Sequence, residues 1–355
     1  MPRFHATIIN ATTLLISLIF SLIIHDVSGG GLSESYRLEE HDKRYSRQWP
    51  PEKYVPDTVG WKKLMDARLR QVAEIDDLDR RYEGYMQTIT PAITTRNFTE
   101  FGFGLARGPE ALSQALREGI RGGLERGEAR LEHSVEVIEG PRCLFIDRPD
   151  LTRRVLDELQ SYTEAWAGIP LTPAIAYGFR LYQNNSILNM HVDKPQTHVI
   201  SMIYHIDSSD DAEPWPILIE DLHGNTHEVI LTPGDVLFYE SSKCLHGRPK
   251  IFNGSWYSSI FVHYYPTHGW QEVDHHMEGH FAIPAGWAAP MAPEEKVATP
   301  LVMLGTSFKE PSCPNAWCRG EETIKWSGPA KEGFWIAPNM ELIPFEPTRV
   351  ERDEL

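Results

Sequence analysis

The stretch Thr226-His-Glu-Val-Ile-Leu-Thr-Pro-Gly-Asp-Val-Leu-Phe-Tyr239 holds two short β-rich runs separated by the turn residues Pro233-Gly234-Asp235. Proline, glycine and aspartate between two apolar runs are typical of a hairpin turn. Further runs of the same kind, with no helical spacing between them, occupy residues 174–183, 197–206, 216–220 and 256–264. Many short strands in succession predict a sandwich or barrel.

Three segments that precede these runs have helical spacing of apolar residues. One extends from Trp61 to Leu78, a second from Pro109 to Leu124, and a third from Pro149 to a stop near Gly168. Their apolar stripes predict helices that pack against the outside of the β core. The expected fold class is therefore α+β, mainly β with flanking helices and an N-terminal helical region.

The composition limits the classes of partner. The 355 residues include 34 Lys and Arg against 50 Asp and Glu, which gives a formal charge of −16. An acidic surface disfavours nucleic acid and anionic membranes, because both require basic footprints. It tolerates neutral or basic polypeptides as substrates.

The first 30 residues have the pattern of a secretory signal peptide. Arg3 precedes an apolar run from Ile8 to Ile24, and the small residues Ser28, Gly29 and Gly30 follow. An uncleaved signal anchor is the alternative, since the run approaches the length of a membrane span. The chain would then contact a membrane only through this segment.

The last four residues, Arg-Asp-Glu-Leu355, resemble an endoplasmic-reticulum retention signal, which implies a retrieval receptor as a partner. Together with the N-terminal pattern, they predict a protein of the endoplasmic-reticulum lumen. Of the sequons at Asn97, Asn184 and Asn253, we expect Asn97 to be the glycosylated one, as in a glycoprotein. The lumen also permits disulfides, and Cys313 with Cys318 is the first expected pair.

His191 and Asp193 place two metal-binding side chains two positions apart. Because side chains alternate along a strand, both project from the same face. His246 lies after the next predicted strands and can supply a second imidazole. Two histidines and one carboxylate on one face of an octahedron suit non-heme Fe(II), although manganese accepts the same ligands.

A second triplet, His205-Ile206-Asp207, matches the same His-x-Asp pattern. The first triplet is preferred because the turn-prone Lys194-Pro195 follows it and places the pair at a strand end. His205 instead leads into the acidic residues 207–213, which look solvated. We therefore interpret His205 as structural.

Residues 174–266 resemble the Fe(II)- and 2-oxoglutarate-dependent dioxygenase superfamily, especially its prolyl 4-hydroxylase-like branch. The resemblance is carried by His191, Asp193, His246 and the turn at 233–235. It implies a double-stranded β-helix core of the jelly-roll or cupin-like type and iron held by those three residues. It also implies 2-oxoglutarate and O₂ as cosubstrates, ascorbate as an accessory reductant, and no catalytic residue beyond the ligands. In the lumen, the expected reaction is hydroxylation of a side chain, plausibly proline, in a secretory polypeptide.

One feature of that family is missing. Its members usually carry Arg or Lys shortly after the distal histidine, where this chain has Ser255 and Trp256. Because a buried carboxylate without a cation is costly, another residue must bind 2-oxoglutarate. The candidate cofactor-binding residues are Arg180, Arg248 and Lys250, together with Tyr182 on the strand face of Arg180.

The expected organisation is a signal peptide (1–29), a polar lead-in (30–58), a helical region (59–140) and an oxygenase core (141–268). An irregular extension rich in Pro, Gly and Trp (269–351) and the retention signal (352–355) follow. Two alternatives to a dioxygenase stay open. One is a lumenal cupin-like module that binds glycans or client proteins, and the other is a metal cupin enzyme that does not use 2-oxoglutarate.

Overall fold

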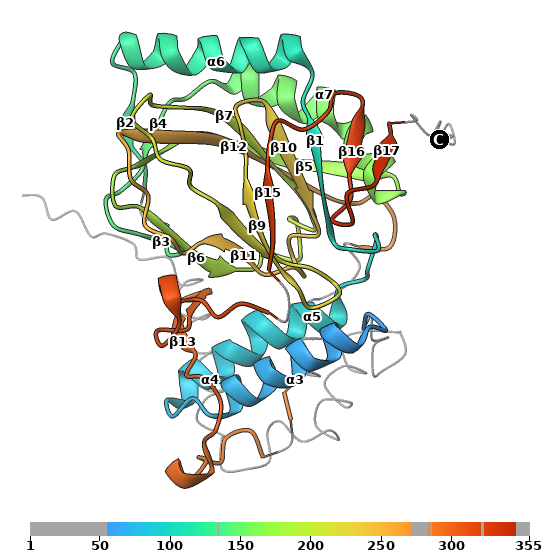
Figure 1. The fold of residues 1–355 in the computed structure, drawn as a ribbon, viewed down its shortest axis with the longest axis vertical. Helices are drawn as coiled ribbons and strands as arrows, with labels where there is room; N and C mark the ends of the chain where they lie inside the picture. Colours follow the sequence, from blue (N-terminus) through green and yellow to red (C-terminus); the bar gives the residue numbers. More distant parts are fainter. Residues whose placement is uncertain (1–54, 134, 271–282, 285, 321–322, 346–355) are drawn as a thin grey trace, which may run out of the picture.

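The computed structural model describes residues 55–133, 135–270, 283–284, 286–320 and 323–345 (Figure 1). The signal segment, nearly all of the polar lead-in and the Arg-Asp-Glu-Leu end lie outside these described residues. In the described part of the chain, no helix is both long and apolar enough to cross a bilayer.

The core consists of two facing antiparallel sheets. One contains the order β10-β7-β12-β5 and the other contains β6-β11-β8-β9. The chain passes repeatedly from one sheet to the other, which is the topology of a double-stranded β-helix and confirms the expected fold. The strands are β5 (Leu171–Gln183), β6 (Ile187–His191), β7 (Ile200–Ser208), β8 (Ile217–Glu220), β9 (Thr226–Ile230), β10 (Asp235–Tyr239), β11 (His246–Arg248) and β12 (Trp256–Pro266).

Short strands from outside this core widen both sheets. Next to β10 lie β1 (Phe103–Arg107), β16 (Phe334–Ile336) and β17 (Leu342–Pro344), and next to β5 lie β4 (Leu144–Phe145) and β2 (Arg130–Leu131). The second sheet gains β3 (Ile138–Glu139), β13 (Val302–Leu304) and β14 (Ser307–Lys309) beside β6, and β15 (Thr323–Ser327) beside β9. The region expected to be helical and the extension expected to be irregular therefore both contribute strands. Segments this short carry too little alternation to be recognised in a sequence.

Two helices cover the outer face of the first sheet (Figure 1). They are α6 (Glu110–Glu125) and α7 (Pro149–Ala167), and both confirm the predicted stripes. Leu116 of α6 and Val155 of α7 are completely buried in one cluster with Phe179 and Ile260 of the sheet. Gly168 ends α7 at φ 69°, a left-handed conformation that favours glycine.

The helix predicted from Trp61 to Leu78 is divided in the structure. α3 (Val59–Ala73) and α4 (Leu78–Gly84) are separated at residues 74–77, where the Asp77 carboxylate accepts a hydrogen bond from the Arg80 amide and caps α4. The π-helix η1 (Tyr85–Ile89) and α5 (Thr90–Thr94) continue this unit. It lies at the end of the molecule opposite α6 and α7 (Figure 1). Two 3₁₀ turns, η3 (Pro293–Glu295) and η4 (Pro314–Ala316), occur in the extension.

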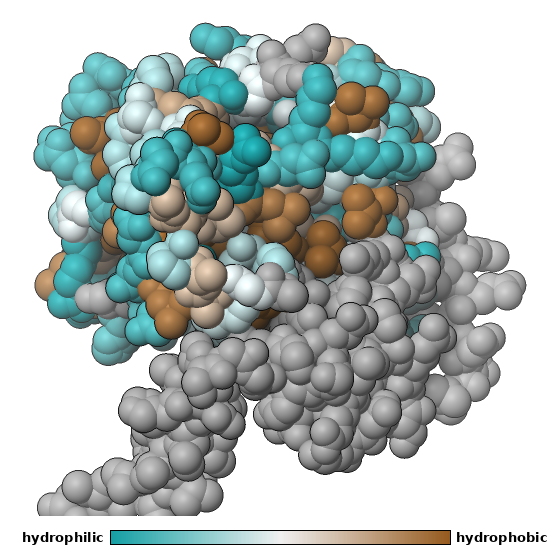
Figure 2. Space-filling model, turned by 90° about the horizontal axis from the view of Figure 1, so that it is seen from below, coloured by the Kyte–Doolittle hydropathy of each residue, from teal (hydrophilic) through white to brown (hydrophobic). Residues whose placement is uncertain are grey.

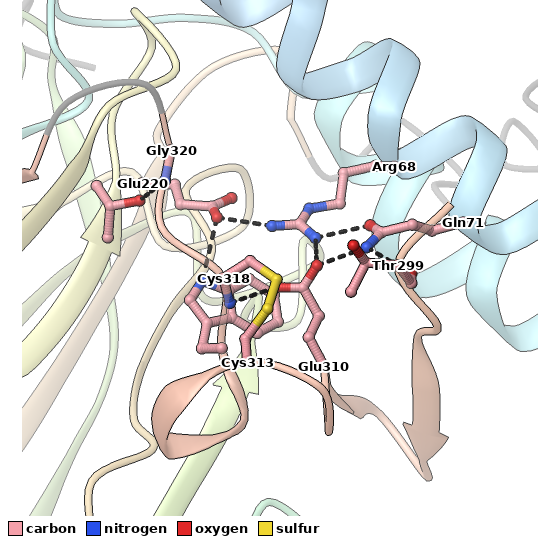
Figure 3. The surroundings of a disulfide bond; sticks show 10 residues. Arg68, Gln71, Glu220, Thr299, Glu310, Cys313, Cys318 and Gly320 are labelled. Carbon is pink, nitrogen blue, oxygen red and sulfur yellow. Dashed lines mark hydrogen bonds and ion pairs between the residues drawn. A yellow bond between two sulfur atoms is a disulfide. The ribbon is translucent and has the colours of Figure 1, made fainter. Parts of the chain in front are cut away.

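A buried ion network joins α3 to the β core and the extension (Figure 3). The Arg68 guanidinium donates to Glu220 of β8 and to Glu310 after β14, both at 2.8 Å. All three side chains are less than 6% exposed. The backbone of Cys318 donates to Glu310, and the Trp317 indole donates to Glu220. The loop that carries these donors therefore belongs to the same network.

The expected Cys313–Cys318 disulfide closes that loop. Cys143 and Cys244 are free and buried. Of the three sequons, Asn97 is partly buried, whereas Asn184 and Asn253 are exposed. The expectation that Asn97 is the glycosylated one stays a prediction.

The exposed surface is mainly polar. In Figure 2 most of the coloured part of the face seen from below is hydrophilic, with apolar residues gathered near its middle. Large exposed apolar side chains among the described residues include Val59, Leu131, Ile251 and Val297, which come from separate elements. Single exposed apolar residues of this kind are common on protein surfaces and do not mark a binding site.

His205 gives a prediction for stability against pH. Its Nδ1 lies 3.0 Å from the Ser258 carbonyl oxygen and its ring stacks on Tyr257. Burial, helped by the nearby Arg248, lowers the pKa of His205 to about 3. In the unfolded chain the His205 imidazole has a pKa of about 6.5, so between pH 6.5 and 3 it binds a proton that it does not bind in the folded protein. The free energy of unfolding should therefore fall as the pH drops from about 6.5 toward 3, by up to about 1.4 kcal/mol per pH unit.

Urea unfolding of wild type and His205→Asn at about pH 7 and about pH 5 measures this contribution. Asparagine retains a donor for the Ser258 carbonyl but does not titrate, so its acid destabilisation should be smaller. Equal acid destabilisation of the two proteins would contradict the prediction.

Candidate metal centre

His191 and His246 face each other across two paired strands. His191 is the last residue of β6 and lies directly opposite His246, the first residue of β11. The two ring centroids are 4.4 Å apart. With Asp193, two positions after His191, they form a group whose possible ligand atoms all lie within 4.8 Å of one another. The structure therefore brings the three expected ligands together.

Both imidazole rings are oriented by backbone carbonyls. His191 Nδ1 lies 2.8 Å from the Asn189 oxygen, and His246 Nδ1 lies 2.9 Å from the Cys244 oxygen. A carbonyl only accepts, so each Nδ1 carries the proton and each Nε2 keeps its lone pair. The Nε2 atoms lie 3.6 and 3.8 Å from Oδ1 of Asp193. This is the arrangement by which proteins orient metal-binding histidines.

The protonation states also suit a metal. Burial is the largest cause that lowers the pKa of both His191 and His246 to about 4, so both rings are neutral near pH 7. Burial raises the pKa of Asp193, and His191 and His198 oppose this shift only in part. A divalent ion at this point would neutralise the carboxylate.

Asp193 is held from three directions. Its amide donates to the Ser241 carbonyl at 2.8 Å, and the Tyr239 hydroxyl reaches Oδ2 at 3.5 Å. Nδ1 of His263 lies 3.8 Å from the same oxygen. The Tyr239 ring also packs edge-on against His246 at 4.5 Å. Tyr239 therefore contacts two of the three expected ligands.

A chain of hydroxyl groups fixes the tautomer of His263. Ser241 Oγ donates to the His198 carbonyl, so it accepts from Ser201 Oγ at 2.6 Å. Ser201 in turn accepts from His263 Nδ1 at 2.7 Å. His263 therefore keeps an unprotonated Nε2, on a ring that lines the cavity beside the ligands.

The three ligands line a cavity of about 360 Å³. Among the described residues, Arg180 is the only Arg or Lys in its wall. Tyr182 is also in the wall, and its buried hydroxyl has no hydrogen-bond partner within the described structure. Burial raises the pKa of Tyr182 to about 12, so the hydroxyl is a protonated donor. A buried donor without an acceptor on a cavity wall fits a polar ligand that the cavity would hold.

The other two candidate cations lie elsewhere. Arg248 is buried but does not line the cavity; it donates to the Trp215 carbonyl and, at 3.1 Å, to the Tyr257 hydroxyl. Lys250 donates to the Pro214 carbonyl at 3.4 Å. Of the three predicted cations, the structure places only Arg180 at the cavity.

The second triplet, His205-Ile206-Asp207, does not belong to the metal centre. The expected reason was that it leads into solvated acidic residues, and the structure gives another one. β7 continues to Ser208, and Asp207 is buried and paired with Arg121 at 2.6 Å instead of solvated. Cys244 is buried and contributes only its carbonyl to the site. Asp235 makes a turn by accepting from the amide and hydroxyl of Thr232. The expected hairpin is wrong, because this turn joins β9 of one sheet to β10 of the other.

The sequence did not indicate several residues of the cavity wall. Glu132 and Val135 come from the segment between β2 and β3, and Thr306 comes from the turn between β13 and β14. None of them belongs to a recognisable pattern. The aromatic strand β12 was evident, but its alternation could not assign His263 to the cavity instead of the core.

No family model matches the sequence, and no curated protein matches it. Several solved structures are similar in fold. A Pseudomonas putida prolyl-4-hydroxylase has 18% identity and a TM-score of 0.37, and the match covers 47% of this chain and 93% of that one. A Trichoplax adhaerens prolyl hydroxylase, in complex with a peptide fragment of hypoxia inducible factor, has 13% identity and a TM-score of 0.37, with 58% and 91% covered. HygX from Streptomyces hygroscopicus, with nickel and 2-oxoglutarate bound, has 14% identity and a TM-score of 0.35, with 47% and 84% covered.

At identities of 13–18% and TM-scores of 0.35–0.37, these matches do not assign a chemistry to the site. The chemistry is inferred from the strand order and side chains of this chain. Its strand order defines a double-stranded β-helix. Two histidines and one carboxylate, brought together in the wall of a cavity, are the ligand set of non-heme Fe(II) oxygenases.

Proposed function

We propose that this chain is an Fe(II)- and 2-oxoglutarate-dependent dioxygenase that hydroxylates a side chain of a secretory polypeptide in the endoplasmic-reticulum lumen. The observation that carries the proposal is the group His191, Asp193 and His246 beside a cavity whose wall holds one cation and one unsatisfied hydroxyl.

Each of these residues has a distinct task. His191, Asp193 and His246 hold Fe(II), which when bound with 2-oxoglutarate activates O₂ for the oxidation. The Arg180 guanidinium and the Tyr182 hydroxyl bind the distal carboxylate of 2-oxoglutarate. Ile203 and Phe261, also in the cavity wall, exclude water from the site.

The cavity favours this function over a binding module without a 2-oxo acid. A glycan presents hydroxyl groups, which do not require a buried guanidinium. A carboxylate does, because only a cation offsets the cost of its burial. Arg180 is the only Arg or Lys in the described wall and pairs with Glu132 there, so it supports a carboxylate ligand that takes the place of Glu132.

The location and the substrate class rest on the ends of the sequence. The N-terminal apolar run and the Arg-Asp-Glu-Leu tetrapeptide support the lumen. The Cys313–Cys318 disulfide is compatible with an oxidising compartment. Polypeptides pass through that compartment unfolded, with their prolines accessible, so a peptidyl proline is the proposed acceptor.

The test begins with anaerobic binding. Protein loaded with Fe(II) should develop a weak visible charge-transfer band when 2-oxoglutarate is added. With air and a library of secretory peptides, succinate should accumulate and one peptide should gain one oxygen atom on proline. Iron binding without response to 2-oxoglutarate would instead indicate a metal cupin enzyme of another type. A protein that binds neither iron nor 2-oxoglutarate would overturn the proposal in favour of a binding module.

A further inference from the structure

Glu132 occupies the one guanidinium that faces the cavity. Its carboxylate accepts from Arg180 Nη2 at 2.6 Å and from Arg180 Nε at 2.8 Å. The Tyr177 hydroxyl donates to the same carboxylate at 2.7 Å. Glu132 is 5% exposed and Arg180 is 9% exposed. The wall of the cavity therefore already contains a bidentate pair between a guanidinium and a carboxylate.

The surroundings of this pair are aromatic. The Arg180 guanidinium carbon lies 5.1 Å from the ring centroids of Tyr177 and Phe261, and 5.9 Å from that of Tyr182. All three residues line the cavity. In such a setting a carboxylate is stable only on a cation, and Arg180 is the only Arg or Lys in the described wall.

The charges of a loaded site do not balance while this pair persists. A divalent ion and Asp193 leave one positive charge, and Arg180 adds a second. The two carboxylates of 2-oxoglutarate neutralise both. Glu132, itself 5% exposed, would then add a buried negative charge to the wall, and a buried charge without a partner costs several kcal/mol.

On the basis of the function proposed above, we propose that Glu132 is an exchangeable internal carboxylate. It neutralises Arg180 while the cavity is empty, and the distal carboxylate of 2-oxoglutarate displaces it. The site would therefore accept dicarboxylic 2-oxo acids at the cost of breaking an internal ion pair. Glu132 sets the affinity and does not take part in the oxidation.

The exchange requires only a side-chain movement. The Glu132 amide donates to the Cys143 carbonyl at 2.9 Å, and its own carbonyl accepts from Arg142 Nε at 2.9 Å. These contacts hold the backbone wherever the carboxylate lies. Arg142 Nη2 donates to the same carbonyl, which adds a second contact to the backbone and none to the carboxylate.

Calorimetry on the full-length protein loaded with Mn(II) tests the exchange without turnover. The titrants are 2-oxoglutarate and pyruvate, which chelates a metal in the same way but lacks the distal carboxylate. Glu132→Gln should bind 2-oxoglutarate about tenfold more tightly than wild type, because no ionised carboxylate competes for Arg180. The affinity for pyruvate should not change. Tyr177→Phe, which removes a donor to Glu132, should shift 2-oxoglutarate binding in the same direction by a smaller factor.

Two other results would overturn the exchange. If both variants bind 2-oxoglutarate as wild type does, or more weakly, Glu132 only positions Arg180. If pyruvate binding rises equally with 2-oxoglutarate binding, the effect does not pass through the distal carboxylate. Failure of the proposed function gives a separate pattern, in which wild type binds Mn(II) but neither 2-oxo acid, and it overturns the exchange as well.

Discussion

His246→Ala is expected to abolish retention of the metal and all turnover of 2-oxoglutarate. His246 lies opposite His191 on the neighbouring strand, so alanine leaves an opening on one side of the ligand group. Loss of one of three protein ligands should reduce the affinity for Fe(II) or Mn(II) by more than about a hundredfold. Metal analysis after reconstitution and desalting measures the loss, and circular dichroism checks that the fold persists.

The matched control is His205→Asn. It alters the other His-x-Asp triplet, whose ring stacks on Tyr257 outside the cavity wall. This variant should retain one equivalent of metal and should still bind 2-oxoglutarate. If His205→Asn loses metal while His246→Ala keeps it, His246 is not a ligand and the metal site lies at His205 instead.

The two proximal ligands could be predicted because their spacing along the chain is local. The two-residue period of a strand predicted that His191 and Asp193 share a face; the structure ends β6 at His191, and Asp193, two residues beyond it, still belongs to the ligand group. The register that brings His246 opposite His191 is not local. β11 has only three residues, and its place between β6 and β8 is set by packing of the whole sheet.

The helices were predictable for the same reason, since their apolar stripes are continuous. Leu112, Leu116 and Ile120 of α6 are all fully buried, as their spacing indicates. The division between α3 and α4 was missed because the stripe continues across it. Asp77 caps the N-terminus of α4 and so marks the start of a new helix. The spacing of apolar residues carries no information about such a cap.

The sequence limited the cation that binds 2-oxoglutarate to three candidates, but it did not show which of them lies at the cavity. Arg180 and Arg248 are both buried on strands. They differ only in the groups that each guanidinium contacts. Arg248 is directed to the Trp215 carbonyl, whereas Arg180 meets Glu132, from a segment near a two-residue strand. No pattern in the sequence pairs residue 132 with residue 180.

The largest loss of stability is expected for Arg68→Met. The methionine side chain fills similar space but leaves Glu220 and Glu310 buried without their cation. Breaking a buried ion pair from one side costs about 3–5 kcal/mol. The free energy of unfolding from urea titration should fall by that amount. Because Arg68 joins α3 to the extension and to β8, proteolysis between these parts should also become faster.

Two further variants distinguish the effect of breaking the buried ion network from the effect of replacing any arginine by methionine. Arg80→Met, which breaks an exposed pair with Glu83, should cost less than about 1 kcal/mol. Arg68→Met combined with Glu220→Gln and Glu310→Gln should recover part of the lost stability, since neutral amides do not need the guanidinium. If the triple variant is less stable than Arg68→Met alone, the two carboxylates have other stabilising partners. Trp317 and Cys318, which donate to them from the disulfide loop, would then hold the extension without Arg68.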